Sequence, residues 1–262
     1  MAEYGRTKKQ FGQAAEAYTA SAIFSDGEDL RWLVEAAAPR SDEDALDVGT
    51  AAGYTAFALA PLVRRVVGID VTPAMVEAAR RNAGQSGLAN FTAEVANAEE
   101  LPFPDGSFDI VACRYTAHHF RRPKVAVGEM ARTLRPGGRL VVVDNTAPEN
   151  GELDQWINHV ERLRDPSHVK EWSEGEWEGF CHAAGLDFRV VRTWTLPLEF
   201  DDWVARSKTP PDRVAELRSL LAGAGPAQKE AFAITDGRFG LVTRLMVGVK
   251  PGVEPGVKRA GA

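Results

Sequence analysis

Residues 45–143 alternate short apolar segments with amphipathic segments, and this rhythm restricts the fold more than any other feature of the chain. Near-continuous runs of Val, Ile, Leu and Ala predict strands, and the apolar residues between them recur at helical spacing. Strands that are apolar on both faces are typical of a parallel sheet with helices on each side. The predicted strands are residues 45–48, 65–69, 91–95, 108–113 and 139–143, and the predicted helices are residues 54–60, 73–86 and 124–134.

The rhythm changes after residue 143. Strands become rare and helical patterns dominate up to a final apolar run. Because right-handed crossovers bring the carboxyl ends of parallel strands to one edge, we expect a ligand site at that edge. The later predicted helices are residues 151–163, 173–184, 210–222 and 226–233, and the later strands are residues 188–194 and 239–249.

These patterns predict one α/β domain at residues 41–250, preceded by an N-terminal helical lid at residues 1–40. The segments 151–184 and 200–235 are expected to be helical insertions that form a cap. Residues 251–262 are rich in Pro and Gly and are expected to form a disordered tail. A length of 262 residues suits this arrangement better than two independent domains.

The charge balance and cysteine content limit the environment and the partners. A net charge of −6 disfavours a nucleic-acid partner, which usually requires a basic stripe. Two cysteines are too few for a secreted disulfide scaffold and favour a reducing compartment. We see no signal peptide, and no stretch reaches the about 20 apolar residues of a membrane span. We therefore expect a cytoplasmic protein without a membrane partner.

The first predicted strand leads into a turn that contains two glycines. Gly49 and Gly53 permit a tight turn and leave room for a ligand against the backbone, but many such turns carry two glycines. Asp70 ends the second strand, 21 positions after Gly49, and its carboxylate can accept hydrogen bonds from both hydroxyls of a ribose. Asp70 could instead cap the next helix, but Thr72 holds the N-cap position before Pro73.

These two features together indicate a nucleoside cofactor. A dinucleotide needs a pyrophosphate cradle, commonly GxGxxG, and the turn reads GTAAGY, which does not match. S-adenosylmethionine (SAM) carries no phosphate and needs only a close backbone and an acid near its ammonium group. Asp47 supplies an acid at the end of the first strand.

Four longer runs resemble the class I SAM-dependent methyltransferases. They are LDVGTAAG from residue 46, GIDVTPAM from residue 68, AEELPFPDGSFDIV from residue 98 and LRPGGRLVVVD from residue 134. The most similar group contains the ubiquinone/menaquinone-biosynthesis C-methyltransferases, also called type 11 methyltransferases. The runs CRYTAHHF, NHVERLRDPSH and WTLPL, which begin at residues 113, 158 and 194, extend the resemblance to the bacterial YcgJ-type proteins of unassigned substrate.

The resemblance implies a Rossmann-like, doubly wound α/β fold. Its seven-stranded, mostly parallel sheet has the order 3-2-1-4-5-7-6, with strand 7 antiparallel. It also implies that Asp70 holds the ribose of SAM, that Val71 and Met75 flank the adenine, and that Asn97 and Ala98 meet its edge. The expected cofactor-binding residues are Asp47, Gly49, Thr50, Gly53, Asp70, Val71, Met75, Asn97, Ala98 and Arg114.

The chain departs from the family pattern at two positions of the cofactor site. Ala51 replaces the central glycine of the first loop, which is costly if the position requires a positive φ. Asn97 replaces the acid of many relatives, so its amide oxygen can accept from the adenine amino group only without charge.

The residues after the fourth strand are expected to lie beside the reacting methyl group. Methyl transfer from a sulfonium mainly requires alignment and exclusion of water, and a base is needed only if the acceptor must lose a proton. We favour His119 as that base, with His118 and His168 as further candidates. Alternatively, one histidine caps the next helix and the other packs against the loop.

A second group of charged residues follows in the first insertion. His159, Arg162, Arg164, Asp165 and His168 could bind an anionic or carbonyl-bearing acceptor, or form a surface helix followed by a salt-bridged turn. No pair of the histidines has the i,i+4 spacing of helical metal ligands, so no metal is expected.

The sequence therefore predicts methyl transfer from SAM to a small-molecule acceptor, with S-adenosylhomocysteine (SAH) as product. An RNA or protein methyltransferase and a SAM-binding regulatory protein that does not methylate stay open as alternatives. An NAD-dependent oxidoreductase fits the fold class but not the loop. The acceptor, the atom that is methylated and the oligomeric state are not predicted.

Overall fold

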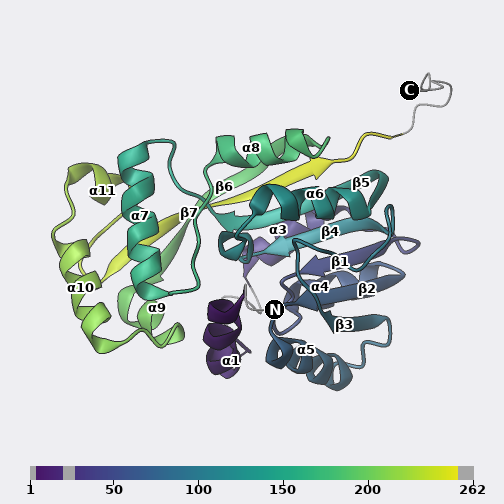
Figure 1. Cartoon of the computed structure of the whole chain (residues 1–262), viewed down its shortest axis with the longest axis horizontal. Coiled ribbons are helices and arrows are strands. Elements are labelled where there is room, and N and C mark those ends of the chain that lie inside the picture. The colour runs from purple at the N-terminus through teal and green to yellow at the C-terminus, as the bar shows by residue number, and fades with distance from the viewer. Residues whose placement is uncertain (1–3, 20–26, 253–262) are drawn as a thin grey trace.

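A seven-stranded sheet organises the part of the chain that the computed structural model describes, residues 4–19 and 27–252, with side chains at 4–12 and 27–252. The strand order β3-β2-β1-β4-β5-β7-β6 is the predicted one (Figure 1). Strand β7 pairs antiparallel with β5 and β6, and all other pairs are parallel. The strands are β1 Asp44–Val48, β2 Arg65–Asp70, β3 Phe91–Val95, β4 Phe108–Arg114, β5 Leu134–Asn145, β6 Asp187–Glu199 and β7 Arg238–Val249.

Helices cover both faces of the sheet, which confirms the doubly wound α/β fold. One apolar cluster joins inward residues of β1, β2, β4 and β5 to α6 and α8, and a second joins the opposite side chains to α3, α4 and α5. The alternation is visible within β1, where Leu46 and Val48 belong to the first cluster and Ala45 to the second. The helices are α3 Glu28–Ala37, α4 Tyr54–Leu59, α5 Pro73–Gln85, α6 Pro123–Thr133 and α8 Glu174–Ala183.

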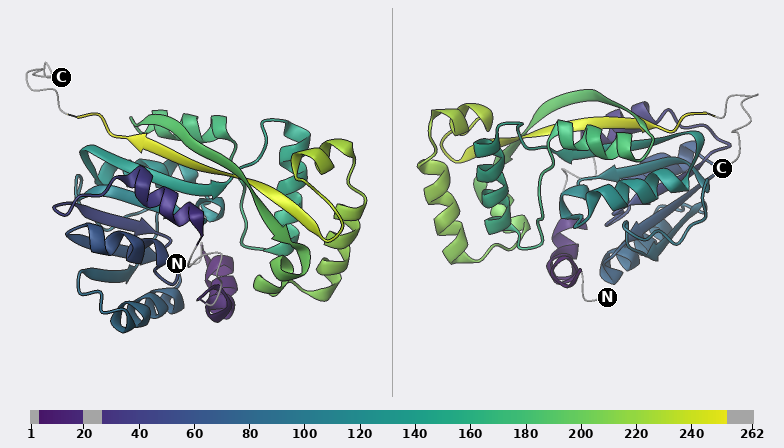
Figure 2. Two further views of the ribbon diagram at one scale, coloured as in Figure 1. Left: turned by 180° about the vertical axis from the view of Figure 1, so that it is seen from behind. Right: turned by 45° about the horizontal axis from the view of Figure 1, so that its top comes forward.

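The cap has an apolar core of its own beyond one end of the sheet. Trp203, Leu217, Phe232 and Phe239 are among its buried members, and it also takes in the distal half of the β6–β7 hairpin. Figure 2 shows how this long hairpin runs from the sheet into the cap. The cap helices are α7 Gly151–Arg164, α9 Phe200–Arg206, α10 Pro211–Ala222 and α11 Pro226–Ala231.

Strand β6 is longer than its predicted segment, residues 188–194. Pairing with β7 continues through Leu198 to Glu199, because the distal residues bury alternate side chains against the cap. Pro197 lies within this extension, and proline is tolerated there because β6 is the outer strand of the sheet.

Helix α1, Gly5–Thr19, lies between the sheet and the cap (Figures 1 and 2). It contacts α5 on one side and α9 on the other, and Gln10 donates a hydrogen bond of 2.7 Å to the Ser207 carbonyl. Helix α3 instead packs on β5 and β7. The two helices of the segment expected to form the lid therefore pack in different places. The expected tail lies outside the described residues from 253 onward.

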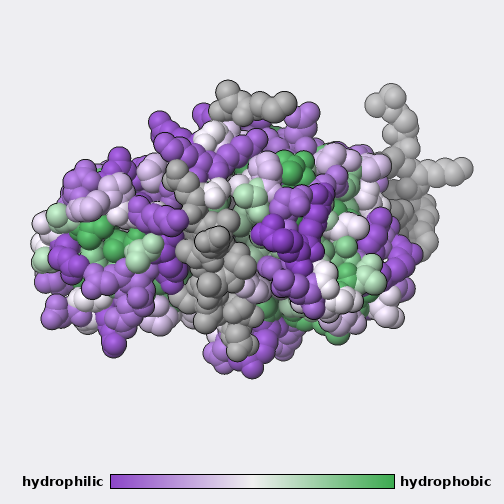
Figure 3. Space-filling view, turned by 90° about the horizontal axis from the view of Figure 1, so that it is seen from below, coloured by the Kyte–Doolittle hydropathy of each residue, from purple (hydrophilic) through white to green (hydrophobic). Residues whose placement is uncertain are grey.

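The surface seen from below is mainly hydrophilic, with smaller hydrophobic areas (Figure 3). Among the described helices, none combines the length and apolar character needed to cross a membrane.

Candidate cofactor and acceptor site

A large cavity opens at the carboxyl ends of β1, β2, β4 and β5, bordered by α1 and the cap. Its empty volume is about 1510 Å³, which includes space open to solvent. It extends from the turn after β1 to the cap helices α7 and α9. Of the expected site residues, it is lined by Gly49, Thr50, Asp70, Val71, Met75, Asn97, Ala98, Arg114, His118, His119 and His168.

The turn after β1 exposes bare backbone to the cavity. Gly49 has a φ of 73°, and a Cβ there would lie 2.2 Å from the Thr116 side chain. The N–H groups of Gly49 and Thr50 both donate to the Ile69 carbonyl, which ties the turn to β2. Ala51 has a φ of 44°, so the position does require the left-handed conformation that costs alanine about 1–2 kcal/mol.

Asp47 lies just behind the cavity wall and does not line it. Its Oδ2 accepts hydrogen bonds from Thr50 Oγ1 at 2.7 Å and from the Ala56 N–H at 3.1 Å. Burial raises the pKa of Asp47 to about 6, although these hydrogen bonds and Arg114 oppose the shift. Gly53 does not line the cavity either. It is the N-cap residue of α4 and has a φ of 99°. Both residues therefore shape the turn from behind.

Asp70 brings a half-buried carboxylate to the cavity at the end of β2. Its Oδ1 accepts from the Thr72 N–H at 2.8 Å, and its Oδ2 accepts from the Ala51 N–H at 3.1 Å. Each oxygen keeps a lone pair for a further donor. Burial raises the pKa of Asp70, although the two N–H groups oppose the shift.

Thr72 holds the N-cap position of α5, as predicted, although its side chain makes no capping bond. The reason is local: the N–H of Met75, which a cap would bind, donates to the Thr72 carbonyl at 3.0 Å. Helix α5 thus begins on backbone bonds and Pro73.

An apolar slot lies next to Asp70. Val71, Met75 and Ala98 line it, and Met75 is almost fully buried. Asn97 also lines it, and its Oδ1 already accepts the Glu99 N–H at 3.0 Å, which leaves one lone pair. Arg114 lines the cavity opposite, where its Nε donates to Asp29 on α3 at 2.6 Å.

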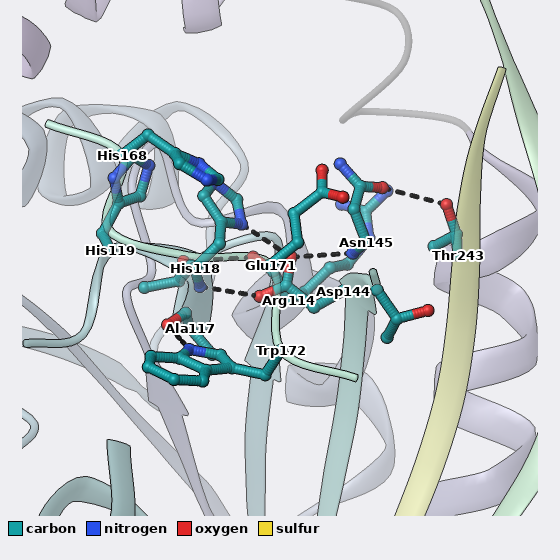
Figure 4. A network of polar contacts seen from close by, with 12 residues as sticks. Arg114, Ala117, His118, His119, Asp144, Asn145, His168, Glu171, Trp172 and Thr243 are labelled. Atoms are coloured by element: carbon teal, nitrogen blue, oxygen red, sulfur yellow. Dashed lines mark hydrogen bonds and ion pairs between the residues drawn. The ribbon is translucent and has the colours of Figure 1, made fainter. Parts of the chain in front are cut away.

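His118 pairs with Asp144 where β4 and β5 end (Figure 4). Its Nδ1 lies 2.7 Å from Asp144 Oδ1, and its backbone N–H donates to Asp144 Oδ2 at 3.1 Å. A carboxylate only accepts, so Nδ1 carries the proton and Nε2 keeps a lone pair when the ring is neutral. Burial alone would lower the pKa of His118, but Asp144 raises it above its ordinary value.

His119 and His168 complete a histidine cluster. The ring centroid of His118 lies 4.2 Å from that of His119 and 5.6 Å from that of His168. His119 Nδ1 donates to the Ser167 carbonyl at 3.1 Å, and His168 Nε2 donates to Asn158 Oδ1 at 2.9 Å. Burial and the neighbouring His118 lower the pKa of both rings, so both stay neutral.

The second group of charged residues divides between surface and cavity. His159 and Arg162 are exposed and do not line the cavity, because their shared face of α7 points to solvent. Arg164, Asp165 and His168 do line it. The sequence grouped these five residues as one site, and the structure brings only three of them together there.

Several cavity residues were missed by sequence reasoning. Asn145 directly follows Asp144 at the end of β5, and strand-end position was a usable signal for it. No sequence pattern indicated that Glu161 and Glu171 line the cavity, because they reach it only through the way α7 and the following loop fold back over the sheet edge. Asn158 fixes that loop: its Oδ1 accepts the Glu171 N–H at 2.7 Å.

Within the described residues, no three His, Cys, Asp or Glu side chains converge as metal ligands would. The histidine ring nitrogens discussed above are directed to separate partners, Asp144, Ser167 and Asn158.

The strand order, the antiparallel β7 and the cavity at the strand ends define a methyltransferase fold of the Rossmann-like type. The family described as "Methyltransferase domain" matches residues 46–142. The uncharacterized methyltransferase YcgJ of Bacillus subtilis (strain 168) is 42% identical over 225 residues, which are 86% of this chain and 89% of that protein. The chain belongs to this methyltransferase family.

Further relatives agree with this assignment. The crystal structure of YcgJ aligns with a TM-score of 0.84 at 40% identity, covering 86% of this chain and 98% of that one. A putative methyltransferase from Bacillus halodurans C-125 aligns with a TM-score of 0.82 at 34% identity, covering 86% and 100%. The demethylmenaquinone methyltransferase of Clavibacter sepedonicus is 32% identical over 235 residues, covering 87% and 93%.

Proposed function

We propose that this methyltransferase uses SAM as its methyl donor and a small molecule as its acceptor. The observation that carries the proposal is the Asp70 carboxylate, which faces the cavity beside the bare backbone of the β1 turn. A carboxylate with free lone pairs suits two ribose hydroxyls, and the adjoining slot of Val71, Met75 and Ala98 suits a flat adenine. The absence of a phosphate cradle in the turn disfavours NAD.

The residues at the β1 turn fit SAM by shape and charge. When bound, SAM supplies an electrophilic methyl group on a sulfonium. Asp47 and Asp70 give this end of the cavity an acidic character, which favours a cationic ligand. Thr116 occupies the space beside Gly49, so the ligand can approach the turn only from the cavity side.

His118 is the best placed base, if the acceptor must lose a proton. Asp144 orients its ring, stabilises the protonated form and leaves Nε2 as the basic atom. His119, which the sequence favoured, is less suited, because burial and His118 make its ring a weaker base. His168 is held by Asn158 and has a lowered pKa for similar reasons.

The cavity continues past the histidines to the cap, which favours an enzyme over a binding protein with a closed acceptor site. A small acceptor fits this enclosed shape better than an RNA or protein chain. One relative carries demethylmenaquinone in its name, and a quinone-like acceptor is one candidate here.

Asp70 provides the first test. Replacing Asp70 by Ala removes two charge-assisted hydrogen bonds to the ribose, each worth about 1.5–3 kcal/mol, so SAH affinity should fall by roughly 100-fold or more. Calorimetric titration with SAH measures this. Asp42→Ala is the control, because the Asp42 side chain is 81% exposed on the loop before β1. Unchanged SAH affinity in Asp70→Ala would refute the ribose assignment.

We further propose that α1 acts as the lid over the bound cofactor. Thr7 and Phe11 of α1 and the preceding Tyr4 line the cavity, and the Tyr4 hydroxyl donates to Glu99. SAH should therefore slow hydrogen exchange of the α1 amides by at least about tenfold, since a ligand beneath α1 opposes its opening. The amides of α10 serve as the control, because α10 does not line the cavity. Equal effects on α1 and α10, or none on α1, would argue against a lid.

A further inference from the structure

Two buried carboxylates face the cap end of the cavity with unused hydrogen-bonding capacity. Glu161 on α7 is 4% exposed and Glu171 in the loop before α8 is 1% exposed, and both line the cavity. The Oε1 atom of each has no hydrogen-bond partner among the described residues. Buried acceptors normally have partners, so this pair points to a ligand that donates hydrogen bonds.

The neighbouring cations are already engaged. Arg164 donates to the Trp203 carbonyl at 3.1 Å and to Glu161 Oε2 at 3.4 Å, and its guanidinium lies 5.1 Å from the centre of the Trp203 ring. Arg206 lines the same end and also interacts with neighbouring groups. Asp165 accepts a hydrogen bond from the Ser167 hydroxyl. Its carboxylate adds negative charge to this end of the cavity and offers no hydrogen-bond donor.

The histidines add acceptors rather than donors. Each ring donates its one N–H group: His118 to Asp144, His119 to the Ser167 carbonyl and His168 to Asn158. The other nitrogen of each neutral ring therefore carries a lone pair. Figure 4 shows the Glu171 carboxylate, the His118 ring and the Asn145 side chain directed to one side of the strand ends. Trp203 Nε1 is the exception, a donor without a partner in the described part of the chain.

The remaining wall of this end is apolar. Leu196, Leu198 and Leu241 come from the β6–β7 hairpin, Trp203 comes from α9, and Phe11 comes from α1. An apolar wall beside an acceptor-rich end matches a molecule with an apolar body and a donor head group.

We infer that the methyl acceptor is an amine whose ammonium head lies between Glu161 and Glu171, with an apolar or aromatic body against the β6–β7 hairpin. Transfer would require the ammonium to lose a proton first, for which His118 Nε2 is the available base. The lone pair of the neutral nitrogen would then form the N–CH₃ bond as the S–CH₃ bond of SAM breaks and SAH leaves. This inference rests on the proposed function and names the substrate class of the same site. An ammonium group offers three donors and a positive charge, which suits two carboxylates better than a hydroxyl does. Burial and the nearby Glu161 raise the pKa of Glu171, so an ammonium that binds there should displace a proton from it.

The test uses three probes that share one apolar body: 2-phenylethylamine, 2-phenylethanol and phenylacetate. Each is titrated calorimetrically into the full-length protein saturated with SAH. The amine should bind at least about tenfold more tightly than the alcohol and more tightly still than the acid. Its binding enthalpy should depend on the ionisation enthalpy of the buffer, because a proton is released.

Glu171→Gln and Glu161→Gln identify the atoms responsible. Each should weaken the amine by about tenfold and leave the alcohol unchanged, because only the charge-assisted contact is lost. Glu171 Oε1 accepts no hydrogen bond from the described residues, so Glu171→Gln should keep its thermal midpoint. Glu152→Gln is the matched control, since Glu152 is an exposed residue of the same helix, α7, and does not line the cavity.

The outcomes separate the two claims. Equal or absent binding of the three probes to the SAH complex, or preference for phenylacetate, would overturn the amine assignment and leave the SAM site standing. Failure of the wild-type protein to bind SAH would overturn the proposed function itself. Amine preference that survives both Glu→Gln changes would also overturn the assignment to this acid pair.

Discussion

At the scale of single residues, the pairing of His118 with Asp144 determines whether the candidate base is available. Burial favours the neutral ring and Asp144 favours the charged one, and the carboxylate prevails. When folding raises the pKa of a group, the protonated group stabilises the fold. This contribution is complete at a pH below the pKa of the unfolded state, which is about 6.5 for histidine. That contribution is lost as the pH rises through the raised value, which is also where Nε2 becomes free to take a proton.

Asp144→Asn should therefore lower the pKa of His118, since the charge that offsets burial is gone. An NMR titration of the imidazole resonances measures this directly. The wild type should lose free energy of unfolding as the pH rises above 6.5, and this loss should be smaller in the variant by at most about 1–2 kcal/mol. A His118 pKa that does not move would contradict the pairing.

Residues next to strand ends were predictable, and residues brought in by the cap were not. Asp70 and His118 follow strands whose apolar runs are clear in the sequence, so their place at one edge follows from parallel topology. Glu171 approaches the cavity because Asn158 on α7 holds its backbone N–H, an arrangement of side chains that no local pattern encodes.

At the scale of elements, the turn between β1 and α4 carries backbone strain. Ala51 adopts a φ of 44°, and its N–H donates to Asp70 Oδ2 at 3.1 Å. The contact with Asp70 keeps this conformation in place and couples the turn to the end of β2. The strain therefore lies where the cofactor is proposed to bind.

Ala51→Gly should relieve that strain. The gain of about 1–2 kcal/mol is offset by the about 0.4–1 kcal/mol that glycine adds to the unfolded chain, so stability should rise by roughly 0–1 kcal/mol. Ala78→Gly in α5 is the control and should cost about 1 kcal/mol or more, because Ala78 lies within a helix. Urea denaturation measures both. If Ala51→Gly destabilises as much as the control does, the strained turn is not a property of the folded protein.

Element boundaries followed the local signals closely in the first half of the chain and less well in the second. Helix α5 begins at the predicted Pro73 and ends one residue before the predicted Ser86. Strand β6 extends five residues past its predicted end at residue 194 to Glu199, because the cap provides a second surface for its side chains. Tertiary packing, rather than propensity, decides the length of such a strand.

At the scale of the whole molecule, the strand ends of the sheet form one end of the cavity and the cap forms the other. The strand order was implied by the resemblance to class I methyltransferases, whereas the apolar rhythm of residues 45–143 predicted only a parallel sheet with helices on both faces. The position of the cap could not be predicted, because it depends on how the cluster around Trp203 and Phe239 packs on the β6–β7 hairpin. The cavity therefore lies between the sheet, with an apolar cluster on each face, and a cap that has an apolar cluster of its own.

Calorimetric titration of the wild-type protein with SAH, and separately with NAD, tests the central claim most directly. We expect SAH to bind at one site per chain and NAD not to bind, because the β1 turn and Asp70 suit a nucleoside without phosphates. At a free concentration of 100 times its Kd, SAH should stabilise the fold by about 2.7 kcal/mol. Binding of NAD instead of SAH, or of neither, would contradict the account.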